Sequence, residues 1–212
     1  MALNNFHLSD HSPQVMSKLD LYLSERQQGN ILSSEQLDVL YLVVEKGRSV
    51  FYTGSAGTGK SFLTNLIIQR LREWFKTQLV AKYGEFWAEH KWRDLFAVTA
   101  PTGMAAINIG GQTLHSWAGI GLGNESAEVL ANRINGGGAA RRRWEDVQVL
   151  IIDEISMVHR DLFAKLEYIA RRVRGKPEPW GSIQLVVAGD FFQLPPVDRN
   201  PRAAIFAFQS DK

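Results

Sequence analysis

The stretch FYTGSAGTGKSFLTNLI, residues 51–67, places a run of small residues between an apolar strand and an amphipathic helix. The strand end formed by Val50, Phe51 and Tyr52 favours burial, and the periodicity predicts a helix from Ser61 onward. Each glycine in such a junction costs about 0.5–1 kcal/mol relative to alanine, because it loses more backbone freedom on folding. The composition of this loop therefore indicates a ligand that requires close approach of the backbone.

The loop matches the phosphate-binding pattern G-x-x-x-x-G-K-[ST], with a strand before it and a helix after it. Backbone N–H groups can converge on phosphates where side chains are small, and the start of the helix adds a positive dipole end. Lys60 is expected to reach the outer phosphates, and the Ser61 hydroxyl to bind Mg²⁺. We predict a nucleotide site over Gly54, Ser55, Ala56, Gly57, Thr58, Gly59, Lys60, Ser61 and Phe62.

An acidic pair, Asp153 and Glu154, follows the apolar run VLII. One carboxylate near Mg²⁺ and a second that activates water are what nucleotide hydrolysis requires. Two acids at this place could instead cap the helix that follows, where negative charge is favourable. With a phosphate-binding loop on another strand of the same chain, the catalytic interpretation is favoured.

Four short apolar runs at wide spacing predict the strands of a parallel sheet that is covered on both faces. These runs are residues 49–54, 95–100, 147–153 and 183–190. Helical periodicity lies between them, at residues 61–74 and 155–174, so we expect an α/β fold with right-handed crossovers. Ligands of such sheets lie at the carboxyl ends of the strands, and both motifs fall there.

Three further segments carry expectations of their own. Residues 75–94 are aromatic and charged and are expected to form an extra helix or a lid. Residues 119–143 contain three consecutive glycines and are expected to form a mobile loop. Residues 1–30 are expected to form an N-terminal helical extension and linker, which leaves residues 31–212 as the nucleotide-binding domain.

Composition narrows the classes of protein that remain. The 212 residues include no cysteine, which excludes disulfides and thiolate metal sites, and no run approaches eighteen apolar residues. The start of the chain lacks a secretory signal pattern. The net charge is only +2, but arginines gather between residues 133 and 174. That cluster could contact phosphates or form a solvated helix face, and charge alone does not decide between the two.

Taken together, the motifs resemble the Pif family of superfamily-one DNA helicases, kin of the RecD-like enzymes. The resemblance is carried by LSSEQ (32–36), FYTGSAGTGKSFL (51–63), VTAPTGMAAINIGGQTLHSWAGIG (98–121), LIIDEISMVHRDLF (150–163) and QLVVAGDFFQLPPV (184–197). It implies a RecA-like P-loop NTPase domain with a mostly parallel sheet, and an ATP-dependent 5′ to 3′ DNA helicase that uses ATP and Mg²⁺. It also implies a part in DNA repair, recombination or telomere maintenance.

The resemblance assigns roles to individual residues. The family's catalytic set is similar to Lys60, Asp153, Glu154 and Gln193 of this sequence. By this resemblance Asp153 and Ser61 would bind the metal, Glu154 would be the base and Gln193 would sense the γ-phosphate. Gln36 is similar to the residue that reads adenine, although Ser33 and Gln36 could equally form a helix capping box. The family's contacts to single-stranded DNA match Pro101, Thr102, Gly103, Thr113, His115 and Ser116. His115 and Trp117 offer stacking faces, unless Trp117 is simply a half-buried aromatic.

Family members carry a second RecA-like domain that supplies an arginine to the ATP site. We expect that domain to be absent from this chain, and residues 1–212 alone to be monomeric, to bind single-stranded DNA weakly and to turn over ATP slowly. The rival hypothesis is a nucleotide-binding module that does not translocate. A plain DNA-binding protein would require neither the loop nor the acidic pair. We expect an intracellular protein, in the nucleus or mitochondrion of a eukaryote or the cytoplasm of a bacterium.

Overall fold

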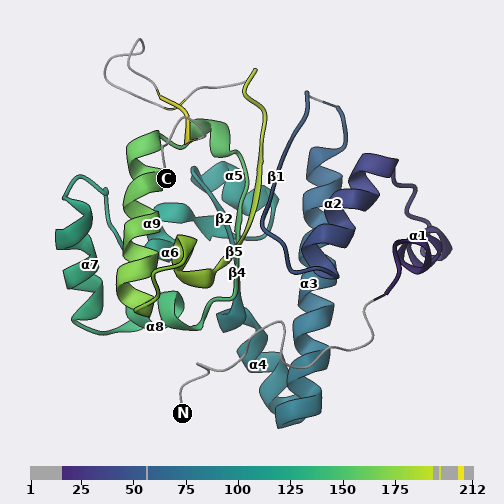
Figure 1. The fold of residues 1–212 in the computed structure, drawn as a ribbon, viewed down its shortest axis with the longest axis horizontal. Coiled ribbons are helices and arrows are strands. Elements are labelled where there is room, and N and C mark those ends of the chain that lie inside the picture. Colours follow the sequence, from purple (N-terminus) through teal and green to yellow (C-terminus); the bar gives the residue numbers. More distant parts are fainter. Residues whose placement is uncertain (1–15, 56, 193–195, 197–204, 208–212) are drawn as a thin grey trace.

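The computed structural model describes residues 16–55, 57–192, 196 and 205–207, and a five-stranded sheet forms its centre (Figure 1). Every pair of neighbouring strands is parallel. Across the sheet the strands are β1 (Val50–Thr53), β5 (Gln184–Gly189), β4 (Val149–Ile152), β2 (Phe96–Ala100) and β3 (Gln112–Thr113). The predicted α/β class and parallel sheet are confirmed. The four apolar runs form four of the strands, whereas β3 is too short to leave a pattern in the sequence.

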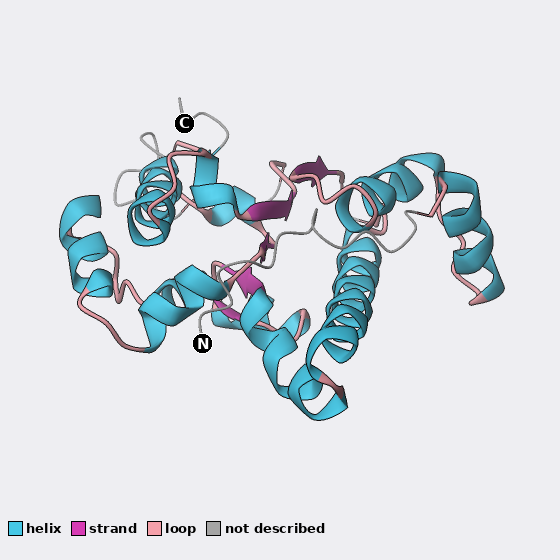
Figure 2. Ribbon diagram, turned by 60° about the horizontal axis from the view of Figure 1, so that its bottom comes forward, coloured by secondary structure: helices cyan, strands magenta, loops and turns pink. Residues whose placement is uncertain are grey.

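Helices cover both faces of the sheet (Figures 1 and 2). One face packs against α1 (Lys18–Gln27), α2 (Ser34–Val44), α3 (Lys60–Tyr83), α4 (Glu85–Leu95) and α5 (Gly103–Asn108). The other packs against α6 (Leu114–Ala118), α7 (Ala127–Asn135), α8 (Ala139–Asp146), α9 (Arg160–Arg174) and the 3₁₀ turn η2 (Pro179–Ser182). In the part of the chain that the structure describes, no helix is long and apolar enough to cross a membrane.

The core is divided by the sheet into two clusters, because successive side chains of a strand point to opposite faces. Ile151 of β4 and Val186 of β5 belong to the cluster beneath α2, α3 and α4. Their neighbours Ile152 and Val187 belong to the cluster beneath α7, α8 and α9. This two-sided burial explains why the strands read as continuous apolar runs instead of alternating ones.

The segment 75–94 is helical, which confirms the expectation of an extra helix. It does not form a lid. Helix α3 runs on without a break to Tyr83, Gly84 makes the turn, and α4 packs back against α3. Phe75 and Leu79 are fully buried, and Trp92 is nearly so. Phe75 and Trp92 are therefore part of the core on one face of the sheet, whereas Phe86 and Trp87, near the turn between the two helices, are exposed.

Two other expectations about this fold are wrong. Residues 119–143 do not form a mobile loop, because α7 and most of α8 lie there and the three glycines only separate them. The helix expected from Ile155 begins at Arg160, after the short 3₁₀ turn η1 (Ile155–Met157). Glycine content was misleading in the first case, because buried residues such as Leu130 and Trp144 hold α7 and α8 in place. Periodicity was misleading in the second, because Val158 has extended backbone that separates η1 from α9.

Helix α1 confirms that a helix precedes residue 30. It begins at Lys18, behind an N-cap in which Ser17 accepts a hydrogen bond from the backbone N–H of Asp20. Leu21 is buried in the same cluster as α2 and α3. Glu25, only 1% exposed, accepts two hydrogen bonds from the Arg70 guanidinium of α3, at 2.6 and 2.9 Å. This helix therefore packs on the nucleotide-binding domain.

Candidate nucleotide and DNA site

The sheet order brings the predicted nucleotide residues together at the carboxyl ends of three neighbouring strands. The phosphate-binding loop follows β1, Asp190 follows β5, and Asp153 with Glu154 follows β4. These strands lie side by side in that order, although β1 ends at Thr53 and β4 begins only at Val149. Parallel strands end at one edge of the sheet, so the loop and the acids face the same space.

The described part of the loop has the backbone that its glycines make possible. Gly57 and Gly59 both have φ near +83°, a left-handed conformation that side chains with a Cβ rarely adopt. Gly59 is also the N-cap of α3, so Lys60 begins that helix. The Lys60 Nζ donates hydrogen bonds to the carbonyl oxygens of Gly54 and Ser55. The ammonium group is thus held over the loop, where phosphates would be bound.

Buried hydroxyls anchor this loop to the sheet. Tyr52 of β1 and Thr64 of α3 share a hydrogen bond of 2.7 Å, and the Thr64 hydroxyl also donates to the backbone carbonyl of Lys60 at 3.0 Å. Burial raises the pKa of the Tyr52 phenol, so it stays neutral. The strand before the loop and the helix after it are therefore tied together, which fixes the geometry of the loop before any ligand is bound.

The acidic pair has the environment of a catalytic centre. Burial raises the pKa of the Asp153 carboxyl, an effect that the backbone N–H of Glu154 and the charge of Lys60 partly oppose. Burial, followed by repulsion from Asp153, also raises the pKa of Glu154. Glu154 has φ of 51°, which is uncommon for a residue other than glycine and is typical of functional positions. Perturbed carboxyls beside a lysine indicate acid–base chemistry.

The helix-capping alternative for the acidic pair is wrong. Glu154 precedes the 3₁₀ turn η1, and its side chain makes no capping hydrogen bond there. The long helix α9 has His159 as its N-cap instead, and the His159 ring accepts from the backbone N–H of Asp161. Removing the capping role leaves the catalytic interpretation of Asp153 and Glu154.

Asp190 is a site residue that the sequence motifs did not single out. It is 2% exposed, and its Oδ2 lies 3.6 Å from the Lys60 Nζ. Its Oδ1 accepts a hydrogen bond from the backbone N–H of Phe192 at 3.0 Å. The available signal was an acid directly after a buried strand, the same signal that identified Asp153. Asp190 links the phosphate-binding loop to the segment that leads toward Gln193.

Gln36 forms the helix capping box, one of the two roles that the sequence left open, and its role in reading adenine stays a prediction. Its Oε1 accepts from the backbone N–H of Ser33, and the Ser33 hydroxyl accepts from the Gln36 N–H, so the capping box is present. Its Nε2 also donates to the Thr58 carbonyl in the loop, at 3.3 Å. The cap of α2 thereby holds the Gln36 amide against the nucleotide loop.

Substitutions at Ser33 and Gln36 should separate capping from adenine recognition. Ser33→Ala should lower the free energy of unfolding by about 0.5–2 kcal/mol and leave the preference for ATP over GTP unchanged. Gln36→Ala should reduce that preference about three- to tenfold, because a hydrogen bond to the base is lost. Urea unfolding and competition of ATP or GTP against fluorescent ADP measure the two effects. Equal preference in both variants would restrict Gln36 to capping.

The predicted DNA contacts lie in two segments of the chain, one directly after β2 and one at the end of β3. Ala100 of β2 pairs with Thr113 of β3, so the segment that follows each strand starts from the same place. Thr102 is the N-cap of α5, and Thr113 is the N-cap of α6. Two helix N-termini, with their free N–H groups, therefore lie next to each other at the strand ends.

The side chains of these two loops differ in how accessible they are. Gly103 and Ser116 are exposed, and Pro101 and His115 are half-buried. Burial lowers the pKa of His115, so its ring is neutral at pH 7 and offers a stacking face instead of a charge. Trp117 is not a stacking face for DNA, because it is only 2% exposed and packs against Trp144, with ring centroids 4.5 Å apart.

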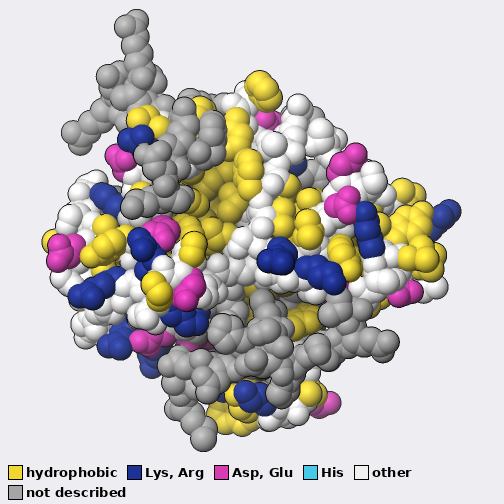
Figure 3. All heavy atoms as spheres, in the orientation of Figure 1, with side chains coloured by type: hydrophobic (Ala, Val, Ile, Leu, Met, Phe, Trp, Pro, Cys, Tyr) yellow, Lys and Arg dark blue, Asp and Glu magenta, His cyan; other side chains and the backbone are white. Residues whose placement is uncertain are grey.

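Most of the arginine cluster is engaged within the protein. Arg133 pairs with Glu125, Arg141 with Glu145 and Arg171 with Glu167. Arg174 donates to three backbone carbonyls at the end of α8 and just after it. Charged side chains of both signs are spread over the helices of the face seen in Figure 3. These contacts favour a role for the four arginines in holding the protein together over a role in binding phosphates.

Two predicted residues, Ala56 and Gln193, lie outside the described residues, so their roles stay predictions. The other nucleotide residues are in place, with Ser61 and Phe62 exposed on the first turn of α3. Among the described residues no group of three or more histidine or carboxylate side chains is placed to hold a metal ion. Mg²⁺ suits this donor set, since it commonly takes one or two protein ligands and completes its shell with phosphates and water.

Comparison with known proteins decides the family. The model of the PIF1-like helicase family matches residues 31–84 and 88–211, which is most of the chain. The chain belongs to the PIF1-like helicase family. Among PIF1-like relatives, the ATP-dependent DNA helicase PIF1 of Emericella nidulans is 53% identical over 82% of this chain and 22% of its own length. The human protein of that name is 47% identical over 84% of this chain and 24% of its own length.

Solved PIF1-like structures share the fold. The Pif1 helicase of Candida albicans has a TM-score of 0.73 and 48% identity, over 86% of this chain and 37% of that one. Pif1 from Bacteroides, crystallised with ADP-AlF3 and single-stranded DNA, has a TM-score of 0.59 and 30% identity, over 85% of this chain and 39% of that one. The chain thus spans about a quarter of the curated relatives and less than half of the crystallised ones.

Proposed function

We propose that the chain forms the first RecA-like motor domain of an ATP-dependent DNA helicase that translocates 5′ to 3′ on single-stranded DNA. The observation that carries this proposal is the meeting of Lys60, Asp190 and the Asp153–Glu154 pair at the ends of three adjacent parallel strands. Membership of the PIF1-like helicase family supports it. A plain DNA-binding domain would not require a lysine and three buried or half-buried carboxylates at one edge of the sheet.

Each residue has a part in nucleotide hydrolysis. The loop from Gly54 to Ser61 binds the phosphates through backbone N–H groups, and Lys60 neutralises their outer charge. Ser61 and Asp153 would hold Mg²⁺, which supplies charge stabilisation at the phosphates when bound. Glu154, with its raised pKa, accepts the proton of the attacking water. Gln193 senses the γ-phosphate.

Single-stranded DNA is the proposed partner at the two adjacent loops. The helix N-termini at Thr102 and Thr113 offer N–H groups to phosphates, and His115 stacks on a base. A second RecA-like domain would close over the nucleotide and supply the remaining DNA contacts. The domain by itself is proposed to be monomeric. The complete protein would act in DNA maintenance, in the compartments that contain DNA.

A binding experiment with DNA tests this proposal. His115→Ala should weaken binding of a labelled oligothymidylate by about fivefold or more, since stacking on one base is worth about 1–3 kcal/mol. The loss should hardly depend on salt, because a neutral His115 contributes no phosphate contact. Fluorescence anisotropy of the purified chain measures both quantities.

His90→Ala is the matched control. His90 is exposed on α4, whose tip lies at the opposite end of the molecule from the nucleotide loop (Figure 1). This variant should bind the oligonucleotide as the parent does. If His115→Ala also binds like the parent, the α6 segment does not contact DNA. If the parent itself binds neither Mg²⁺-nucleotide nor DNA, the proposed function is wrong.

A further inference from the structure

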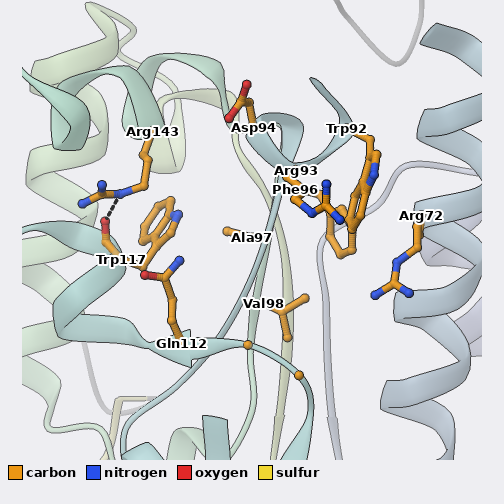
Figure 4. A pocket seen from close by; sticks show the side chains of 12 residues that line it. Arg72, Trp92, Arg93, Asp94, Phe96, Ala97, Val98, Gln112, Trp117 and Arg143 are labelled. Atoms are coloured by element: carbon orange, nitrogen blue, oxygen red, sulfur yellow. Dashed lines mark hydrogen bonds between the residues drawn. The ribbon is translucent and has the colours of Figure 1, made fainter. Parts of the chain in front are cut away.

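A groove lined by arginines opens at the β3 edge of the sheet (Figure 4). One part is a cavity of about 430 Å³ with β2 as its floor. Trp117, Gln112 and Arg143 form one wall in Figure 4, and Trp92, Arg93 and Arg72 form the other. A second cavity, of about 550 Å³, lies between α3 and α5 and shares Arg72 and Gly110 with the first. The two together are called the arginine groove.

We propose that the arginine groove binds the sugar-phosphate backbone of a DNA strand beyond the contacts at Thr113–Ser116. This inference rests on the proposed function, because it extends the same DNA path along the protein. It assigns a role to Arg72, Arg93 and Arg143, none of which belongs to the nucleotide site or to the predicted DNA loops.

None of the three arginines of the groove forms a salt bridge with another of the described residues. Arg70, two residues before Arg72 on α3, is bound by Glu25 and Glu73. Arg72 and Arg93 instead lie over the Trp92 ring, with guanidinium carbons 5.0 and 4.7 Å from its centroid. Stacking of this kind holds a guanidinium in place and leaves N–H groups at its edge for an anion.

Arg143 lines the opposite wall of the groove, with its guanidinium turned toward the backbone of α6 (Figure 4). Its Nε donates to the Trp117 carbonyl at 2.7 Å, the bond drawn in Figure 4, and its Nη2 donates to the Ser116 carbonyl at 3.2 Å. Burial lowers its pKa, which still leaves the guanidinium charged at neutral pH. The same side chain therefore supports the predicted DNA segment and adds a positive charge beside it.

The shape of the groove follows from the shortness of β3. That strand pairs only with Thr99 and Ala100, so the first residues of β2 have no strand beside them on this edge within the described chain. Gly111 crosses β2 so closely that a Cβ would lie 2.3 Å from the Val98 carbonyl oxygen. Only glycine permits this approach, and Gly111 lines the first cavity there.

The groove is continuous with the proposed DNA loops. Gln112 lines it and directly precedes Thr113, and Asn108 and Gly110 line it at the end of α5, the helix that begins at Gly103. Its acids are outnumbered: Asp94 lies at the rim, and Glu73 is already bonded to Arg70 and Gln69. A regular row of anions that arrives from Thr113–Ser116 fits this arrangement better than a peptide, which would require a longer free strand edge to pair with.

The test compares charge-matched double variants by anisotropy on labelled oligothymidylates of about 6 and about 16 nucleotides. Arg72→Gln with Arg93→Gln should weaken binding of the longer strand about tenfold at low salt. The slope of log K against log salt should also become shallower by about 1.4, which corresponds to two lost phosphate contacts. The short strand should bind the variant almost as it binds the parent. Arg26→Gln with Arg172→Gln removes the same charge from exposed sites on α1 and α9 and should match the parent.

Each other outcome has a definite meaning. If the parent binds DNA and the groove variant binds the long strand equally well with the same salt slope, the groove proposal is overturned and the proposed function stands. A different outcome is that an oligoglutamate peptide binds the parent but not the groove variant, while the affinity for DNA is the same in both proteins. In that case the groove is a peptide site and the proposal is wrong. A parent that binds no DNA overturns the groove proposal, and one that also binds no Mg²⁺-nucleotide overturns the proposed function as well.

Discussion

Lys60→Ala is expected to abolish binding of Mg²⁺-nucleotide by this chain. The Lys60 ammonium lies over the loop, bonded to the Gly54 and Ser55 carbonyls and 3.6 Å from a carboxylate oxygen of Asp190. Truncating one partner of a buried, hydrogen-bonded charge contact costs about 2–5 kcal/mol, which is about a 30- to 4,000-fold loss of affinity. Titration with fluorescent ADP and Mg²⁺ measures this loss.

A control is needed because Lys60→Ala also removes a cation beside the buried Asp190, which could lower stability. The double variant Lys60→Ala with Asp190→Asn removes that charge and should melt closer to the parent, yet still fail to bind. Lys82→Ala, at the far end of α3, should bind nucleotide normally. Parent-like affinity in a folded Lys60→Ala protein would show that the loop is not the nucleotide site.

Glu154→Gln and Asp153→Ala are expected to fail in different ways, in a protein that carries this domain with its second motor domain. Glu154→Gln should retain nucleotide binding and lose about 10²–10⁴ in turnover, because a general base is removed. Asp153→Ala should weaken Mg²⁺-dependent binding instead, since a metal ligand is removed. Single-turnover ATP hydrolysis and Mg²⁺ titrations of nucleotide binding separate the two.

The matched control for this pair is Glu128→Gln, which neutralises an exposed acid on α7 and should change neither quantity. Identical losses in the two site variants would contradict the division of roles between Asp153 and Glu154. Retained turnover in Glu154→Gln would assign the base to another group, and Asp190, the buried carboxylate beside Lys60, is one candidate.

Expectations drawn from local chemistry agree with the structure. The apolar runs became β1, β2, β4 and β5, because strands covered on both faces must be apolar throughout. The capping box of α2 and the left-handed glycines of the phosphate-binding loop also agree with the pattern, since each depends on residues a few positions apart. By itself, the sequence was therefore sufficient for the fold class, the family resemblance and the nucleotide loop.

Tertiary structure decided what depends on residues far apart in the chain. Asp190 became a site residue only when β5 was placed between β1 and β4, next to Lys60. The sequence of residues 119–143 predicts a mobile loop, but in the structure α7 and α8 pack into the buried cluster around Trp144. The arginine groove has no sequence signature, because its guanidinium groups come from α3, α4 and α8. Burial and charge pairing are properties of the assembled layers, so no local pattern records them.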